Sequence, residues 1–214
     1  SGNQLGEAAH TSVLVAFLGG LMVTCFGELI ARPLLSLLSV PDEVFAMALL
    51  YLRVYLLGIP VILLYNFTSA IFRSQGDTKT PLAALTFSGM LNVALNLYFV
   101  RGLGMTVEGV ALATVLSNLT SSAILLTRLA RGSSTVTLRL GELRIEKKAL
   151  KKILSIGVPS GVQSMVFSLA NITIQASINS LGATVMAASS AALNLEIFSY
   201  FIVTSFGQAC TTFV

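Results

Sequence analysis

The chain consists mainly of long apolar runs separated by short polar segments. Six runs reach about 20 residues, which is the length that an α-helix needs to cross the hydrocarbon core of a membrane. They cover residues 9–30, 45–72, 81–100, 109–129, 153–181 and 184–213. Several exceed that length, so we expect tilted or kinked helices. The pattern predicts an all-α fold: a polytopic membrane helix bundle with six transmembrane helices.

Prolines and a polar hinge mark the ends and bends of these runs. Pro60 is expected to bend the second helix, and Pro33 to end the first one before an interfacial turn at residues 34–40. In the segment 73–81, Gly76 suits the left-handed conformation that closes a helix. Either Asp77 or Thr80 is then expected to cap the third helix, with Pro81 in its first turn.

Composition supports the membrane assignment. Hydrophobic residues make up 55% of the 214 residues and charged residues only 10%, with a mean hydropathy of +0.86. A soluble globular domain has about 25% charged residues. Ten of the thirteen Lys and Arg residues lie in the segments 73–79 and 128–152, which helix parity places on one side of the membrane. The positive-inside rule predicts that this side is cytoplasmic in a cell membrane, and the charge requires no nucleic acid.

The third helix carries polar residues at four-residue steps, Ser88, Asn92 and Asn96. Such a spacing places them in one stripe along the helix. Asparagines on a face buried in the membrane are costly unless they find partners. Two interpretations stay open: hydrogen bonding between helices, or binding of a cation or a proton-carrying partner. On the fourth helix, small and polar residues predict a close-packing face at Ala111, Thr114, Asn118, Ser121 and Ser122.

The last two helices hold the largest polar load. A strip on the fifth helix, bordered by Gln163, contains Ser160, Ser164, Ser168, Asn171, Gln175 and Asn179. A strip of this kind is expected to face protein or water, because lipid would leave its amides unsatisfied. The sixth helix adds Asn194 on one side and Glu196 roughly opposite. A carboxylate within a span favours a functional role for Glu196, although a bond to a neighbouring helix is the alternative.

Other reactive residues lack companions in the sequence. Cys25, Cys210 and the single histidine His10 show no metal-ligand spacing, so we expect no metal site and no cofactor. Glu28 is expected to reach the interface, and Arg53 to anchor its helix there beside tyrosines. No paired acids or Ser/Lys dyad occur within the helices, which argues against an enzyme.

Four segments together resemble the multidrug and toxic compound extrusion (MATE) family. Residues 73–81 resemble its loop Arg-Gly-x-Gly-Asp-Thr-Lys/Arg-x-Pro, with Ser74 in place of a common Gly. Residues 92–96 resemble the Asn-x-x-x-Asn of the next helix, residues 104–114 its Gly-rich entry to the helix after that, and residues 157–182 the first helix of the second lobe.

The resemblance implies the domain organisation. Family members have twelve helices in two lobes, and this chain would hold helices three to eight. Residues 1–130 would then be four helices of the N-terminal lobe, 131–152 a basic cytoplasmic linker, and 153–214 the first two helices of the C-terminal lobe. Since the chain begins without Met and stops within an apolar run, we expect it to be a fragment whose missing helices come from the same polypeptide.

The resemblance also implies the activity, a secondary multidrug exporter that exchanges amphipathic, often cationic compounds for H⁺ or Na⁺. Substrate- or ion-binding candidates are Asn92, Asn96, Gln163, Asn171, Gln175, Asn179, Asn194 and Glu196. Some members carry a Glu where Phe167 stands here, so coupling through that position is not expected. The alternative is a lipid-linked oligosaccharide flippase of the same superfamily, but the expected cavity residues here are uncharged amides and hydroxyls.

Overall fold

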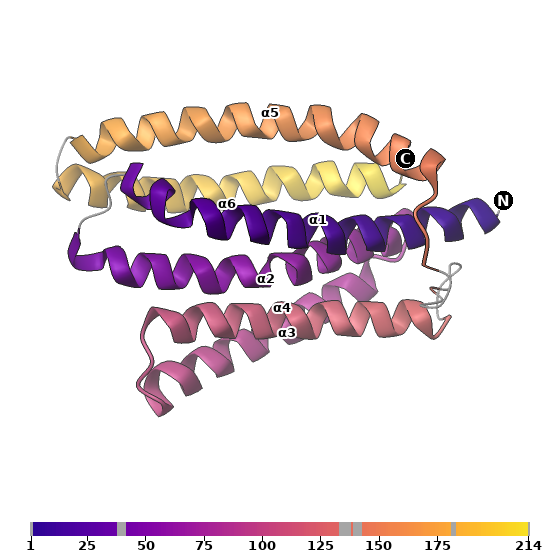
Figure 1. The fold of residues 1–214 in the computed structure, drawn as a ribbon, viewed down its shortest axis with the longest axis horizontal. Coiled ribbons are helices and arrows are strands. Elements are labelled where there is room, and N and C mark those ends of the chain that lie inside the picture. Colours follow the sequence, from indigo (N-terminus) through magenta and orange to yellow (C-terminus); the bar gives the residue numbers. More distant parts are fainter. Residues whose placement is uncertain (1, 38–41, 133–137, 139–142, 181–182, 214) are drawn as a thin grey trace. The chain divides into compact units, whose positions relative to one another are not determined.

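The computed structural model describes residues 2–37, 42–132, 138, 143–180 and 183–213. All six predicted runs are helices, as Figure 1 shows. They are α1 (Gly2–Leu37), α2 (Asp42–Ser74), α3 (Lys79–Leu97), which a π-helical turn η1 (Tyr98–Gly102) extends, α4 (Val107–Ala130), α5 (Lys147–Ser180) and α6 (Ala183–Phe213). Five helical stretches among the described residues, from α1 to α5, are long and apolar enough to cross a membrane. The all-helical membrane fold is confirmed, whereas the crossing by α6 stays a prediction.

Two helices are longer than the sequence predicted. Helix α1 continues through Pro33 to Leu37, so the interfacial turn expected at 34–40 is wrong for residues 34–37, whereas residues 38–40 lie outside the described part of the chain. A proline removes a single backbone donor, which a helix tolerates where neighbouring groups satisfy the freed carbonyl. The sequence of residues 146–152 is typical of a separate basic amphipathic helix on the membrane surface. Helix α5 begins at Lys147, however, so most of this segment forms the first turns of α5. The sequence of residues 135–138 favours an extended piece, but apart from Leu138 these residues lie outside the described part of the chain.

The chain divides into two compact units, Ser1–Lys151 and Lys152–Val214. In the first unit α1 packs on α2, α2 packs on α4, and α4 packs on α3 (Figure 1). A hydrophobic core lies where α1, α2, α3 and α4 meet the basic connections, and it contains Val13, Phe72, Ala84, Leu125, Leu129 and Leu138. Leu138 is held there by its backbone N–H, which donates to the Leu129 carbonyl at 3.1 Å. The second unit contains most of α5 and all of α6.

Helices α1 and α2 approach closely through small residues. A Cβ placed on Gly20 would lie 2.4 Å from the Pro60 Cα, so only glycine fits there. Four residues further along α1, the Thr24 hydroxyl donates to the Leu56 carbonyl at 2.6 Å. Pro60 has no N–H, so it cannot pair with this carbonyl four residues before it, and Thr24 supplies the missing donor. Small residues at helical spacing on α1, Gly20, Thr24 and Gly27, favour such a close approach in a membrane. Gly20 and Thr24 make it at the bend residue Pro60 of α2.

Both basic connections lie at the same end of the first unit, as helix parity predicted. The second connection binds the N-terminal part of α1: Arg144 Nη2 lies 3.2 Å from Glu7 Oε1, and the Glu146 N–H donates to Thr11 Oγ1 at 3.0 Å. The close-packing face expected on α4 is also present, since Ala111, Ser121 and Ser122 are buried. The contacts of Arg144 and Glu146 thus hold the end of the second connection against α1.

Candidate functional site

The loop between α2 and α3 has the conformation that its residues predict. Gly76 has φ +78°, in the left-handed region, and its N–H donates to the Arg73 carbonyl at 2.9 Å. The Thr80 N–H donates to Asp77 Oδ1 at 3.0 Å, so Asp77 is the residue that caps α3. A carboxylate there accepts a donor that the helix leaves unpaired and also suits the positive end of the helix dipole.

The same contacts lower the pKa of the Asp77 carboxyl from its ordinary value. Hydrogen bonding by Thr80, through its side chain and its backbone, is the main cause, and the Arg128 charge adds to it. Because the folded pKa is the lower one, this group stabilises the fold fully above the ordinary pKa of about 3.9. The contribution is lost as the pH falls through the folded value.

Substitution of Asp77 tests this cap. In the full polypeptide, Asp77→Ala is expected to lower the free energy of unfolding by about 1 kcal/mol at neutral pH, because a cap is removed. Asp77→Asn is the matched control: asparagine caps equally well at neutral pH but does not titrate. Unfolding midpoints measured between pH 3 and pH 7 check both effects. If Asp77→Asn loses as much stability at pH 7 as Asp77→Ala, the cap is not the cause.

The two asparagines of α3 form a hydrogen-bonded cluster with α4. Asn96 Nδ2 donates to the Asn92 backbone carbonyl at 2.9 Å and to Asn92 Oδ1 at 3.0 Å. Asn92 Nδ2 in turn donates to Ser117 Oγ on α4 at 3.2 Å, and Ser117 donates to the Thr114 carbonyl at 3.0 Å. The first open interpretation, bonding between helices, is thus present for Asn92. Ser117, the partner from α4, was not among the predicted site residues.

One atom of this cluster is left without a partner. Asn96 Oδ1 is buried and accepts no hydrogen bond within the part of the chain that the structure describes. A buried acceptor without a donor costs about 1–3 kcal/mol. An amide oxygen is also the type of ligand that hard cations prefer. The second interpretation, binding of a cation or of a proton-carrying partner, therefore stays open, and Asn96 Oδ1 is the atom that would bind it.

The other predicted site residues lie in the second unit and are not brought together by any described contact. Gln163 and Asn171 on α5 have exposed side chains, as do Asn194 and Glu196 on α6. Gln175 and Asn179 lie in α5, but their side chains are outside the described part of the structure. That the strip faces an interior cavity stays a prediction.

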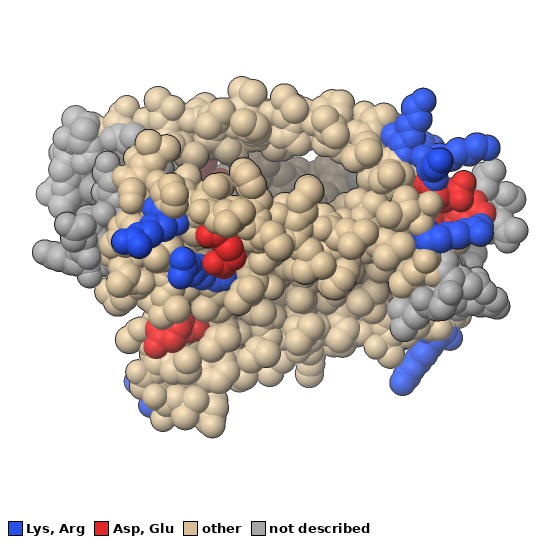
Figure 2. Space-filling model, viewed as in Figure 1, with Lys and Arg blue, Asp and Glu red and all other residues tan. Residues whose placement is uncertain are grey.

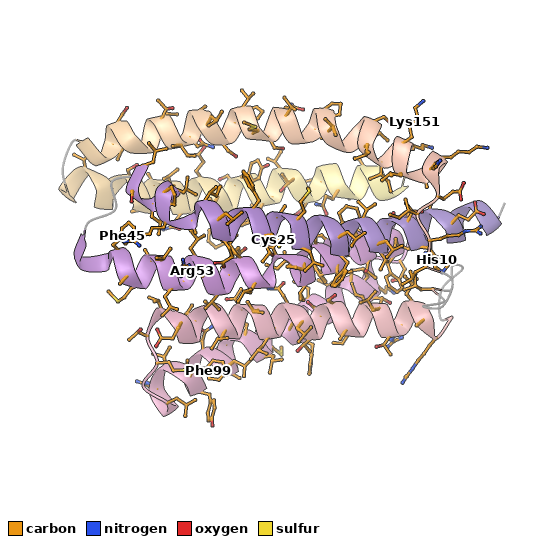
Figure 3. All side chains as sticks on the ribbon, viewed as in Figure 1. His10, Cys25, Phe45, Arg53, Phe99 and Lys151 are labelled. Carbon is orange, nitrogen blue, oxygen red and sulfur yellow. The ribbon has the colours of Figure 1, made fainter. Side chains whose placement is uncertain are left out.

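A charged pair that sequence reasoning missed joins α1 to α2. Arg53 Nε lies 3.4 Å from Glu28 Oε2, and Figure 3 labels Arg53 on α2. The other carboxylate oxygen, Glu28 Oε1, is buried without a hydrogen-bond partner among the described residues. The sequence showed both charges within apolar runs, but only the packing of Gly20 on Pro60 brings Glu28 level with Arg53.

The isolated histidine has a local role. His10 is buried, and its Nδ1 lies 2.6 Å from the Gly6 carbonyl of its own helix. Both cysteines, Cys25 and Cys210, are exposed free thiols. Among the described residues, no group of three His, Cys, Asp or Glu side chains could hold a metal ion. The polar cluster of α3 and α4 is consequently the best-defined candidate site.

Long apolar helices with amide and hydroxyl groups held between them define a multi-pass membrane protein. The MatE family model matches residues 2–98. The multidrug resistance protein YpnP of Bacillus subtilis, named as probable, is 30% identical over 89% of this chain and 43% of its own length. The probable multidrug resistance protein NorM of Thermotoga maritima is 28% identical over 96% of this chain and 45% of its own length. The chain therefore has homologues in the MatE family, and residues 2–98 match its family model, in agreement with the motifs of the sequence.

Solved structures show the same fold. A MOP superfamily transporter from Pyrococcus furiosus matches with a TM-score of 0.87 at 24% identity, over 97% of this chain and 46% of that one. The chain thus spans less than half the length of the curated relatives and of the solved structure that it matches.

Proposed function

We propose that this chain is part of a secondary exporter that moves small amphipathic compounds out of the cell in exchange for H⁺ or Na⁺. The curated relatives described above are named multidrug resistance proteins, which supports transport of small compounds. We further propose that the protein lies in the cell membrane with its basic connections on the cytoplasmic side.

The observation that carries the proposal is the unsatisfied Asn96 Oδ1 in the cluster with Asn92 and Ser117. Buried polar groups in membrane helices are retained where they bind substrates or ions. An amide does not titrate, so this cluster supports ion binding by oxygen atoms, not proton uptake. Proton coupling would need a carboxylate elsewhere, and Glu196 on α6 is the residue that we propose for it.

The cargo is proposed to be cationic or neutral, because the predicted cavity residues are amides and hydroxyls. The test is accumulation of ethidium in efflux-deficient cells with and without the full polypeptide. We expect lower accumulation in cells that express it, and a response to an imposed H⁺ or Na⁺ gradient identifies the coupling ion. Equal accumulation, together with translocation of a lipid-linked sugar, would favour the flippase instead.

Substitution of Glu196 separates the two coupling ions. If Glu196 carries protons, Glu196→Gln is expected to lower export at neutral pH about fivefold, at the low end of the usual range for coupling between sites. The pH dependence of export should also become flat. Glu108→Gln, at the start of α4, is the matched control and should leave export unchanged. Export by Glu196→Gln that follows pH and sodium like the wild type would remove this residue from the mechanism.

A further inference from the structure

Two hollows at the basic end of the first unit join into one groove along α4. The first, of about 290 Å³, lies between the start of α3 and the end of α4 and is lined by residues including Lys79 and Ala83. The second, of about 550 Å³, follows α4 itself. Ile124 and Arg128 line both hollows, so they are continuous. We call this surface the α4 groove.

The α4 groove is built from two neighbouring rows of α4 at four-residue spacing. One row is Leu119, Ala123, Thr127 and Arg131, and the other is Thr120, Ile124 and Arg128. In each row the residues before the last are apolar or carry a hydroxyl, and the last residue is an arginine. Thr120 and Thr127 present little polarity to the groove, since their hydroxyls donate to the carbonyls of Leu116 and Ala123 in their own helix. Ala123, with its single methyl group, leaves the space between larger neighbours.

The length of the α4 groove matches one leaflet of a bilayer. At a rise of about 1.5 Å per residue, the twelve steps from Leu119 to Arg131 span about 18 Å of helix axis. Half of a hydrocarbon core is about 15 Å thick. The apolar part thus lies at the depth of acyl chains, and the arginines lie at the level of the headgroups of the leaflet that the basic connections face.

The charge at the mouth of the groove is positive. Lys79, Arg128 and Arg131 line it, and the carboxylate of Asp77 lies near enough to Arg128 to interact with its charge. Among the described residues named here, three cations thus face one anion. Figure 2 shows basic side chains, in blue, at the end where α4 meets the second connection.

We propose that the α4 groove binds one anionic phospholipid, with an acyl chain against Ala123 and Ile124 and its phosphate near Arg128 and Arg131. Basic pockets between membrane helices recognise anionic headgroups in this way. The apolar part of the groove selects a lipid over a free phosphate, because inorganic phosphate would leave Leu119, Ala123 and Ile124 exposed. The site runs along the second half of α4, and its lining includes no residue of the cluster of Asn92, Asn96 and Ser117.

Native mass spectrometry of the full polypeptide in detergent tests the proposal by counting bound lipids, without any measurement of transport. Phosphatidylglycerol and phosphatidylcholine with the same acyl chains are titrated in parallel. We expect one phosphatidylglycerol to bind in preference to phosphatidylcholine. The double substitution Arg128→Gln and Arg131→Gln should weaken binding of phosphatidylglycerol about 30-fold, since each basic residue near the surface contributes roughly a factor of five.

Two further variants identify the groove. Ala123→Leu fills the α4 groove without changing any charge and should weaken the binding of both lipids. Because Ala123 is exposed, this substitution leaves the hydrophobic core intact. Arg101→Gln, at the opposite end of α3 and η1, removes one positive charge elsewhere and should leave binding unchanged. The proposal is overturned if the two lipids bind equally, or if Ala123→Leu binds lipid like the wild type. It is also overturned if inorganic phosphate binds and the substitutions of Arg128 and Arg131 weaken its binding as much as they weaken lipid binding. So does a lack of lipid binding because another segment of the full polypeptide covers the groove.

Discussion

Replacing Gly20 by alanine in the full polypeptide is expected to lower the free energy of unfolding by about 1–3 kcal/mol, the usual cost of an added methyl group in a packed interior. The new Cβ would lie 2.4 Å from the Pro60 Cα, which is backbone and cannot rotate away. Helix α1 would have to move away from α2. That movement would also lengthen the 2.6 Å hydrogen bond from the Thr24 hydroxyl to the Leu56 carbonyl, to which Pro60, four residues further on, has no N–H to donate.

Gly19 provides the matched control for this substitution. It is adjacent in α1, but a Cβ placed on it would meet nothing within 4 Å. Gly19→Ala should therefore raise the free energy of unfolding by about 0.5–1 kcal/mol, because alanine loses less conformational entropy in a helix than glycine. Thermal unfolding of both variants in the same detergent should give shifts of opposite sign. Equal shifts would show that α1 and α2 do not pack through Gly20 in the full polypeptide.

The helices themselves could be predicted because lipid imposes a simple rule on the sequence. Every backbone group must find a partner within the membrane, so an apolar run of sufficient length forms a helix whatever its neighbours do. The rule does not predict where a helix ends in a polar region. Residues 34–37 and 147–152 thus continued α1 and α5, although local signals indicated a turn and a separate helix.

Contacts between helices were predicted less well, because they depend on how one helix slides along another. The small residues of α1 indicated a close contact but not its partner. Once Gly20 lies against Pro60, antiparallel packing places Thr24 near Leu56 and Glu28 near Arg53. The ion pair follows from this register, which no pattern within a single helix contains.

For the candidate site too, the sequence predicted which residues share a face of one helix but not their partners on another helix. Four-residue spacing was enough to place Asn92 and Asn96 on one face of α3, and their mutual hydrogen bonds confirm it. Ser117 could not be found in this way, because its role depends on the packing of α4 against α3. For the polar strip of α5, the sequence identified a face that must avoid lipid but not the surface that covers it.

A leucine in place of Asn96 is expected to lower export by the full polypeptide about 10- to 100-fold, within the usual range of coupling between sites, while the free energy of unfolding stays the same or rises. Transport and stability are expected to change in different directions because the two polar atoms of the amide differ in their hydrogen bonding. Its Nδ2 donates to Asn92 at 2.9 and 3.0 Å, but its buried Oδ1 has no donor among the described residues. Leucine loses the two bonds within α3, so Asn92 Oδ1 loses the donor Asn96 Nδ2. It also removes the unsatisfied Asn96 Oδ1, which alone costs about 1–3 kcal/mol, and this gain offsets the loss.

Asn118→Leu on α4 is the control, because Asn118 is also half-buried and its Nδ2 donates to the Thr114 carbonyl of its own helix at 2.8 Å. Asn118 shares the Thr114 carbonyl with Ser117 but bonds to neither Asn92 nor Asn96 in the contacts described, so its substitution should leave export near the wild-type level. Efflux rates and unfolding midpoints measured on the same preparations separate the two roles of Asn96. If Asn96 had only a structural role, its replacement would lower stability and transport together. If its oxygen is retained for an ion or substrate, the replacement should lower transport without lowering stability.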